Sequence, residues 1–330
     1  MTFSTGSSVW RIFPSGKTRW KRSWLPVMIG LALIAQCGPA ACLGRHTGPD
    51  DKLVIGFSGG IDSIVLLHAV RTLNKSVSAL HVHHGLSPDA DRWEQFCRDT
   101  CAAWSVPLQQ ARVDVERGSV DGLEAAARRA RHEVFANVDA DWVLLAHHRG
   151  DRAETMLFNL LRGAGVRGAG AMPECSGRLL RPLLEVGRAE IVDYAQAHGL
   201  TWVDDHSNAD TRYSRNFLRN EILPALRQRF PAVEQRLASA AARFAETADL
   251  VDELALLDLG TRLPAFPLDV ECLSALSEPR ARNVLRYLLA RHGIGIPSED
   301  RLTETLRQCL TAAPDRHPTL SFGRHVLRRR

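Results

Sequence analysis

The sequence predicts an α/β fold built on a doubly wound, mostly parallel sheet. Short apolar segments alternate with helix-like segments from Lys52 onward, and strands separated by helices of this length form βαβ units. Polar motifs follow several of the strands, which matches the rule that ligands of such sheets bind beyond the carboxyl ends of the strands. With 330 residues and 45% hydrophobic content, the chain is long enough for this domain and a smaller second one.

Four strand–helix pairs are expected in order along the chain. The first strand, Leu53–Phe57, is apolar enough to lie buried in a parallel sheet. The expected strands are 53–57, 77–82, 108–115 and 142–146, and the helices that follow them are 61–74, 90–104, 120–136 and 153–162. A long connecting helix is expected at 230–256, before a C-terminal region that ends at residue 330.

The motif Ser58–Ser63, SGGIDS, lies where the first strand ends and the first helix begins. Two glycines before a helix N-terminus form an anion site, because amides without helical partners point outward and the helix dipole favours negative charge. Ser58 and Ser63 add hydroxyl donors, and Asp62 adds a carboxylate that can hold Mg²⁺ against phosphates. No Gly-Lys-Ser/Thr follows, so the motif is not a Walker P-loop. It resembles the PP-loop of the ATP pyrophosphatases, whereas the plainer alternative is an ordinary Ser/Gly turn.

Two further blocks carry histidines and carboxylates. The segment His81–Ser87, HVHHGLS, follows the second strand and either lines a nucleotide pocket or is solvated. After the fourth strand, Asp151 and Glu154 are spaced i, i+3 at the start of a helix, so their side chains project from one face. That pair suits a pocket for a cationic amine, although acidic residues at a helix N-terminus also simply complement the dipole.

Arginines gather in a Gly-rich loop, Arg162–Gly170, and in a block between Trp202 and Leu226. In the second block they alternate with Tyr213 and Phe217, and guanidinium groups beside aromatic rings suit single-stranded RNA. Acidic residues of the same block balance the arginines, so a charged helix remains an equal alternative. The seven cysteines include no CxxC pair, and Cys97 and Cys101 are expected in the core.

The first 49 residues are expected to lie outside the fold. They contain six basic residues and no acidic one, whereas the rest of the chain carries 36 basic and 37 acidic residues, so the net charge of +5 does not by itself indicate nucleic acid. The apolar run Leu25–Ala35 follows a basic stretch, as in a secretory signal, but it is short for a membrane span. We interpret the segment as a dispensable extension of a cytoplasmic protein without a membrane partner, with export as the alternative.

Taken together, these blocks resemble the tRNA(Ile)-lysidine synthase family. The resemblance covers about residues 53–226 and rests on SGGIDS, HVHHGLS, AHHRGDRAET running into LLRGAGVRG, RPLL, and DHSNADTRYSRNFLR. It implies a ligase that uses ATP and Mg²⁺ to join free L-lysine to C2 of the wobble cytidine in the CAU anticodon of tRNA(Ile). The cytidine is first adenylated, and the products are lysidine, AMP and pyrophosphate. A homodimer is left open.

The resemblance also implies domains and residue roles. The domains are an extension at 1–49, a PP-loop catalytic domain at 50–229, a helical linker at 230–256 and a C-terminal tRNA-binding domain at 257–330, which is incomplete if longer family members set the standard. The catalytic residues are Asp62, Asp151, Glu154 and Arg215, with Asp62 near Mg²⁺. ATP is expected at Ser58, Gly59, Gly60, Ile61, Asp62 and Ser63. Lysine is expected at His147, Asp151 and Glu154, and tRNA at Arg162, Arg167, Arg212 and Arg219.

One departure from the family pattern concerns the helix with the carboxylate pair. The family's AHHxDDQAET reads AHHRGDRAET here, so Gly150 replaces the first Asp and Arg152 replaces Gln. We therefore assign lysine to Asp151 and Glu154, and interpret the missing carboxylate as a contact to metal or phosphate. Two alternatives are another PP-loop tRNA-modifying enzyme, such as a thiolase, and an RNA- or nucleotide-binding remnant. A thiolase needs paired cysteines near the PP-loop, and the sequence places none there.

Overall fold

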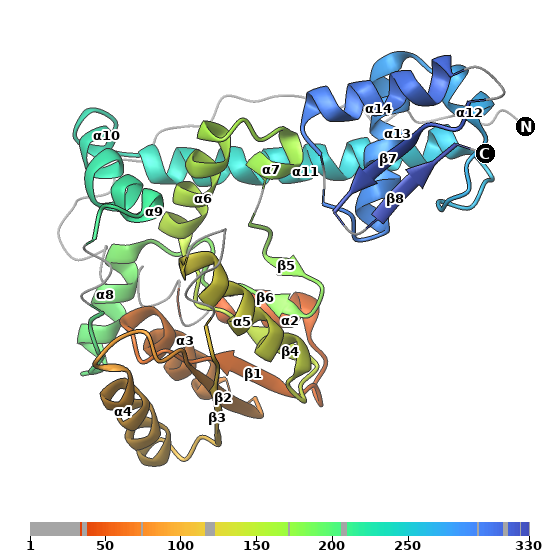
Figure 1. The fold of residues 1–330 in the computed structure, drawn as a ribbon. Coiled ribbons are helices and arrows are strands. Elements are labelled where there is room, and N and C mark those ends of the chain that lie inside the picture. Colours follow the sequence, from red (N-terminus) through yellow and green to blue (C-terminus); the bar gives the residue numbers. More distant parts are fainter. Residues whose placement is uncertain are drawn as a thin grey trace, which may run out of the picture.

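A computed structural model describes residue 34 and residues 38–73, 75–115, 123–170, 172–205, 210–295, 297–312, 316–323 and 325–329. Its centre is a six-stranded sheet with the order β3-β2-β1-β4-β6-β5, in which all neighbours are parallel except β5 and β6 (Figure 1). The strands are β1 (Leu53–Gly56), β2 (Val77–His83), β3 (Leu108–Arg112), β4 (Trp142–Leu144), β5 (Cys175–Ser176) and β6 (Leu179–Leu180). The predicted fold class is confirmed, and the four predicted strands are β1 to β4.

Helices cover both faces of the sheet, as the alternation of side chains along β1 requires. Leu53 and Ile55 belong to a core shared with three helices, α3 (Ile61–Thr72), α4 (Ala90–Ala103) and α8 (Arg188–Ala197). Val54, between them, packs with Phe135 of α5 (Leu123–Asn137) on the opposite face. The sheet is therefore doubly wound. At its carboxyl edge, β1 is followed by α3 and β4 is followed by α6 (Arg149–Leu161).

A helical region connects this sheet to the C-terminal region. After α7 (Val166–Ala169) and α8, the chain forms α9 (Ser214–Phe217), a π-helical segment (Leu218–Ile222), α10 (Leu223–Arg229) and the long α11 (Val233–Leu259). The helix predicted at 230–256 is thus confirmed as α11. It packs against α6 and α7 along one half and against α13 along the other (Figure 1).

The C-terminal region has a core of its own. It consists of α12 (Val270–Ser274), α13 (Glu278–Arg291), α14 (Glu299–Thr311) and the antiparallel pair β7 (Thr319–Phe322) and β8 (His325–Arg328). Leucines of α13 and α14 pack around Ala255 and Leu259 of α11, so the long helix supplies one wall of this core. Among the described residues, no helix combines the length and the apolar character that a membrane crossing needs.

The structure corrects one boundary. Residues 1–33 and 35–37 lie outside the described residues, but Pro39–His46 form a helix, α2, that packs on α3. Cys42 and Leu43 are buried in the main core, and Arg45 donates two hydrogen bonds to Glu174, of 2.6 and 2.9 Å. The expectation that the fold begins after residue 49 is therefore wrong for α2. The helix has eight residues, too few for a periodic apolar pattern to stand out after the longer run before it.

Candidate active site

The PP-loop motif forms the turn between β1 and α3. The hydroxyl group of Ser63 donates to the carbonyl oxygen of Gly60 at 2.9 Å and lies 3.3 Å from the Oγ of Ser58. Gly60 is the N-cap residue of α3, so the amides of Ile61, Asp62 and Ser63 belong to the first helical turn and have no carbonyl partner within the helix. The six predicted ATP-binding residues thus form one turn, with hydroxyl groups and unpaired amides gathered at a helix N-terminus.

Gly59 explains the tightness of this turn. Its φ is +83°, in the region that L-residues avoid, and its carbonyl oxygen accepts a hydrogen bond from Val203 N at 3.0 Å. A Cβ atom at this position would lie 3.1 Å from Cys97 Sγ and 3.1 Å from Val203 Cγ2. The back of the turn therefore rests on α4 and on the segment before residue 206, contacts that the sequence reasoning missed.

The position of Cys97 also corrects the statement that no cysteine pair lies near the PP-loop. Cys97 contacts the loop and Cys101 follows one helical turn later, so the pair is close in space although remote in sequence. Both thiols are buried, which raises the pKa of Cys97 to about 12 and that of Cys101 to about 11. Thiols that stay protonated are poor nucleophiles, so this pair is core packing, as the sequence predicts.

The second part of the site is the start of α6, just beyond β4. The Nδ1 atom of His148 accepts a hydrogen bond from Gly150 N at 3.0 Å, and Asp151 Oδ2 accepts one from His148 N at 2.9 Å. This reciprocal cap begins the helix at Arg149, four residues before the predicted start at Ala153. Asp151 therefore caps the helix with one carboxylate oxygen and keeps the other for a second partner.

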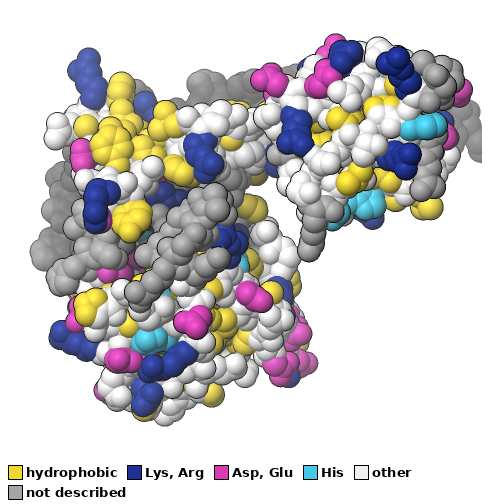
Figure 2. Space-filling model, in the orientation of Figure 1, with side chains coloured by type: hydrophobic (Ala, Val, Ile, Leu, Met, Phe, Trp, Pro, Cys, Tyr) yellow, Lys and Arg dark blue, Asp and Glu magenta, His cyan; other side chains and the backbone are white. Residues whose placement is uncertain are grey.

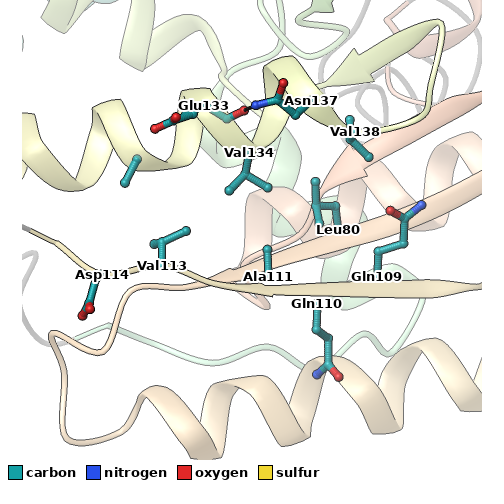
Figure 3. A pocket seen from close by; sticks show the side chains of 11 residues that line it. Leu80, Gln109, Gln110, Ala111, Val113, Asp114, Glu133, Val134, Asn137 and Val138 are labelled. Carbon is teal, nitrogen blue, oxygen red and sulfur yellow. Dashed lines mark hydrogen bonds between the residues drawn. The ribbon is translucent and has the colours of Figure 1, made fainter.

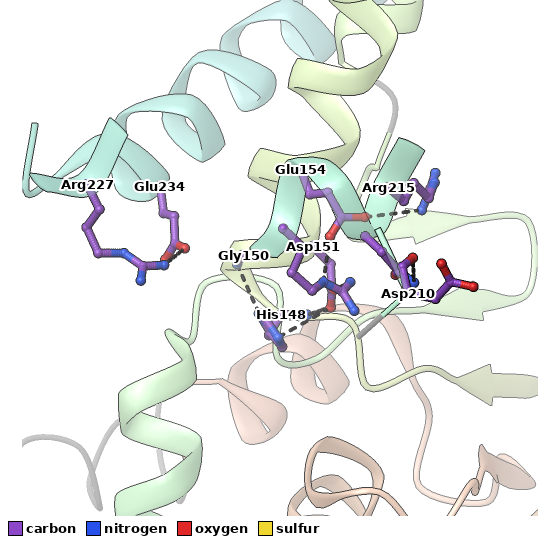
Figure 4. Close-up of polar contacts among 10 residues, drawn as sticks. His148, Gly150, Asp151, Glu154, Asp210, Arg215, Arg227 and Glu234 are labelled. Carbon is purple, nitrogen blue, oxygen red and sulfur yellow. Dashed lines mark hydrogen bonds and ion pairs between the residues drawn. The ribbon is translucent and has the colours of Figure 1, made fainter. Parts of the chain in front are cut away.

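Asp151 and Glu154 face the same space, as predicted (Figure 4). An arginine bonds to both of them. Arg219 donates from Nε to Glu154 Oε2 at 2.8 Å and from Nη2 to Asp151 Oδ1 at 3.0 Å. Arg215 Nη1 is 3.8 Å from Glu154 Oε1. The Glu154 side chain is only 2% exposed, and this burial raises its pKa although Arg219 opposes the shift. Burial acts in the same direction on Asp151, but the neighbouring histidines and Arg219 outweigh it and lower its pKa.

The PP-loop and the carboxylate pair follow the neighbouring parallel strands β1 and β4, so both lie at the carboxyl edge of the sheet. Asp62, in the first turn of α3, forms an ion pair with Arg188, the first residue of α8. Burial alone would lower the pKa of Arg219, but the charges of Glu154, Asp151 and, more weakly, Asp62 raise it. Each acidic side chain predicted to hold a cation is thus paired with an arginine of the chain. No local pattern in the sequence points to Arg188, because it lies 126 residues from its partner.

His147 directly precedes His148, the N-cap residue of α6. The Nδ1 atom of His147 is buried without a hydrogen-bond partner among the described residues, and burial, supported by Arg181, Arg131 and Arg128, lowers its pKa. A neutral imidazole there can accept or donate one hydrogen bond to a ligand. The arginines of α5 are site neighbours that the sequence analysis missed, and their i, i+3 spacing within AAARRARHE was the available signal.

The four arginines expected to bind tRNA divide into two kinds. Arg162 lies exposed over the ring of Phe158 at 5.3 Å, and exposed Arg212 pairs with Asp210. Arg167 instead pairs with Asp252 of α11, and Arg219 turns inward to the carboxylates. Basic and hydrophobic side chains intermingle on the surface over α6, α9 and α10 (Figure 2).

A separate cavity of about 500 Å³ lies between β3 and α5 (Figure 3). Gln109 of β3, Asp114 just after β3, and Glu133 and Asn137 of α5 are among the polar residues that line it. None of the predicted site residues lines it. The predicted site is therefore the open carboxyl edge around the PP-loop and the start of α6, and not this cavity.

Comparisons with known proteins identify the family. A PP-loop domain matches residues 41–226, and a TilS substrate binding domain matches residues 268–330. A curated tRNA(Ile)-lysidine synthase from Alkalilimnicola ehrlichii is 42% identical over 300 residues, which cover 87% of this chain and 67% of that protein. The chain belongs to the tRNA(Ile)-lysidine synthase family. The PP-loop match begins at residue 41, inside α2, in agreement with the packing of that helix.

Other family members match over less of their own length. The synthase from Nitrosomonas europaea is 45% identical over 286 residues, 83% of this chain and 62% of that protein. The synthase from an Azoarcus species is 47% identical over 279 residues, 81% of this chain and 61% of that protein. The chain thus spans about three-fifths of the length of these relatives. Among solved structures, a U34-tRNA thiolase from Methanococcus maripaludis shares the fold, with a TM-score of 0.55 and 16% identity over 67% of this chain and 80% of that one.

Gly150, which departs from the family motif, has a structural counterpart in His148. A Cβ atom at position 150 would lie 2.7 Å from His148 Cε1 and 3.0 Å from Nδ1. The imidazole that caps α6 thus occupies the space that a side chain at position 150 needs. In this chain the glycine and the histidine cap depend on each other.

Proposed function

We propose that the chain attaches free L-lysine to C2 of the wobble cytidine in a CAU-anticodon tRNA(Ile), with cleavage of ATP to AMP and pyrophosphate. The supporting observation is that an anion-binding helix N-terminus and a buried carboxylate pair follow the neighbouring parallel strands β1 and β4, so both lie at the carboxyl edge of one sheet. A phosphate-binding turn beside a cation-binding pocket suits a reaction between a nucleotide and an amine. Family membership supplies the choice of amine and of RNA.

Each part of the site has a task in the two steps. In the first step the cytidine O2 attacks the α-phosphate and pyrophosphate leaves, bound by Ser58, Ser63 and the first-turn amides of α3. In the second step the lysine amine attacks C2 and AMP leaves. The amine must lose a proton before it attacks, and we assign Glu154 as the base that accepts this proton. Burial raises the pKa of Glu154, and a general base works best when its pKa is close to the working pH.

Asp62 fits the role of a magnesium ligand. Mg²⁺ is usually held by one or two carboxylates together with substrate phosphates, and Asp62 lies in the phosphate-binding turn with its side chain partly exposed. Its present partner is the cationic Arg188, so Mg²⁺ bound there would take over the carboxylate contact that Arg188 makes here. Bound there, the ion would neutralise charge on the pyrophosphate leaving group.

The RNA partner fits the surface beside the site. Arg162 and Arg212 are exposed basic side chains, and the exposed rings of Tyr213 and Phe217 lie in the same region of the chain. Guanidinium groups and aromatic rings together bind phosphate and unstacked bases. We place the reaction in the cytoplasm, where tRNA, ATP and free lysine are present, and a homodimer stays a prediction.

The test is a labelled-lysine assay. Protein, ATP, radiolabelled lysine and CAU-anticodon tRNA are incubated, and label is measured in the RNA together with the nucleotide products. We expect label that depends on ATP, with AMP and pyrophosphate as products. The variant carrying both Asp62→Ala and Ser63→Ala should lose about 100-fold or more in rate, because it lacks preorganised contacts to the leaving group. Asp139→Ala, a carboxylate whose side chain is 89% exposed, is the matched control. ADP and phosphate as products, without AMP, would overturn the proposal.

A further inference from the structure

Arg219 occupies the place that the proposed function assigns to the lysine amine. Its guanidinium contacts both members of the carboxylate pair, at 2.8 Å from Glu154 and 3.0 Å from Asp151. Its side chain is 44% exposed, whereas those of Glu154 and Asp151 are 2% and 18% exposed. Arg219 thus lies between the carboxylates and the solvent from which a free amino acid would arrive.

Two cations cannot hold this pair in the same way at once. One carboxylate oxygen of Asp151 accepts the hydrogen bond that caps α6. Arg219 donates to the other oxygen of Asp151 and to one oxygen of Glu154. A buried carboxylate without a cation is costly, and Arg215 reaches only Glu154 Oε1, at 3.8 Å, so the two oxygens that Arg219 holds need a new positive partner when Arg219 leaves. An ammonium group that binds both carboxylates therefore takes over contacts that Arg219 makes here.

The backbone around Arg219 is suited to such an exchange. Arg219 lies in the π-helical segment Leu218–Ile222, between the four-residue α9 and the seven-residue α10. Pro224 follows at the start of α10 and has no N–H to donate to the carbonyl of Asn220, which weakens the regular helical pattern there. Within residues 214–223 only Leu218 and Leu223 are buried, and segments with few buried contacts open at low free-energy cost.

We propose that Arg219 is an internal competitor of the lysine substrate: it holds the Asp151–Glu154 pair in the ligand-free chain and is displaced when the amine binds. The inference rests on the proposed function, because it takes the pair to be the lysine site. The apparent affinity for lysine is then lowered by the fraction of chains in which Arg219 is already displaced. The predicted tRNA contact of Arg219 requires the displaced state.

The experiment compares lysine affinity in two arginine variants of the full chain. Arg219→Gln removes the competitor and leaves the carboxylates in place. Arg227→Gln removes a nearby exposed arginine that pairs with Glu234 instead and serves as the matched control (Figure 4). L-lysine is titrated by calorimetry, and the KM for lysine is measured with ATP and tRNA at saturation. If Arg219 closes the pair in about 90% of chains, its removal should tighten lysine binding about tenfold and lower the KM equally. Arg227→Gln should change neither.

The outcomes separate this inference from the proposed function. Unchanged or weaker lysine binding in Arg219→Gln, with the wild type active in the labelled-lysine assay, overturns the competitor role alone. A wild type that attaches no lysine overturns the proposed function. If Arg219→Gln does not fold, Arg219→Met decides, because methionine keeps an unbranched apolar side chain at this position and supplies no cation. Lysine binding tighter than in the wild type then supports the proposal, and wild-type or weaker binding overturns it.

Discussion

Gly59→Ala tests whether the phosphate-binding turn depends on close packing from behind. The added methyl group meets two obstacles. The φ of +83° is strained for any residue with a side chain, and the new Cβ atom would lie 3.1 Å from both Cys97 and Val203. Either the side chains of Cys97 and Val203 must shift or the turn itself must shift. The turn carries the proposed pyrophosphate donors.

The size of the effect follows from two separate costs. A left-handed backbone costs a residue with a side chain about 1–2 kcal/mol, and crowding in a packed region costs about 1–3 kcal/mol. Gly177 has a φ of +58° and no atom within 4 Å of its Cβ position, so Gly177→Ala carries the first cost alone. For a domain of this size, about 2–4 °C of melting temperature corresponds to 1 kcal/mol. Gly59→Ala should therefore melt about 2–12 °C lower than Gly177→Ala.

Thermal unfolding and pyrophosphate release measure the two consequences. Gly59→Ala should reduce ATP-dependent pyrophosphate release about 100-fold, because a displacement of about 1 Å in a catalytic group has effects of that order. Gly177→Ala should leave release unchanged. Adding Cys97→Ala to Gly59→Ala removes one crowded contact, so the double variant should be more stable than the sum of the single changes predicts. Equal melting temperatures for the two glycine variants would refute the reasoning.

Three further predictions concern α2, a buried histidine and Gly150. Leu43→Ala should destabilise the chain by about 2–5 kcal/mol, because Leu43 is only 1% exposed. Leu263→Ala should have little effect, because Leu263 is 83% exposed. Equal melting temperatures of the two variants would contradict the packing of α2. Burial, together with the charge of Arg131, lowers the pKa of His84 from 6.5 to about 4. Between these two pH values the imidazole is protonated in the unfolded chain but not in the folded one, so the free energy of unfolding should fall as the pH falls through this window. His84→Gln should flatten that decline in melting temperature, and an unchanged slope would contradict it. Gly150→Asp should displace the His148 ring and raise the rate of pyrophosphate release without changing the lysine requirement. Gly150→Ala is the control, because it displaces the ring without adding a carboxylate. A faster release in both variants would contradict a contact between the added carboxylate and metal or phosphate.

The sequence by itself determined the features that depend on neighbours along the chain. Strand-length apolar runs, the two-glycine turn at a strand–helix junction and the i, i+3 spacing of Asp151 and Glu154 are local patterns, and all three lie where expected. Helical geometry alone makes two carboxylates at that spacing face one way. The element boundaries were less accurate, because the cap that starts α6 at Arg149 uses the ring of His148, a residue that seldom signals a helix start.

Only the tertiary structure decided what these local features touch. The partners of Asp62 and Glu154 are Arg188 and Arg219, 126 and 65 residues away, and the wall behind Gly59 comes from Cys97. No periodicity encodes such contacts, because charge pairing and close packing are set by how helices from different βαβ units meet at one edge of the sheet. For the same reason Arg219, read from the sequence as an RNA contact, faces two buried carboxylates that need a cation whenever no substrate provides one.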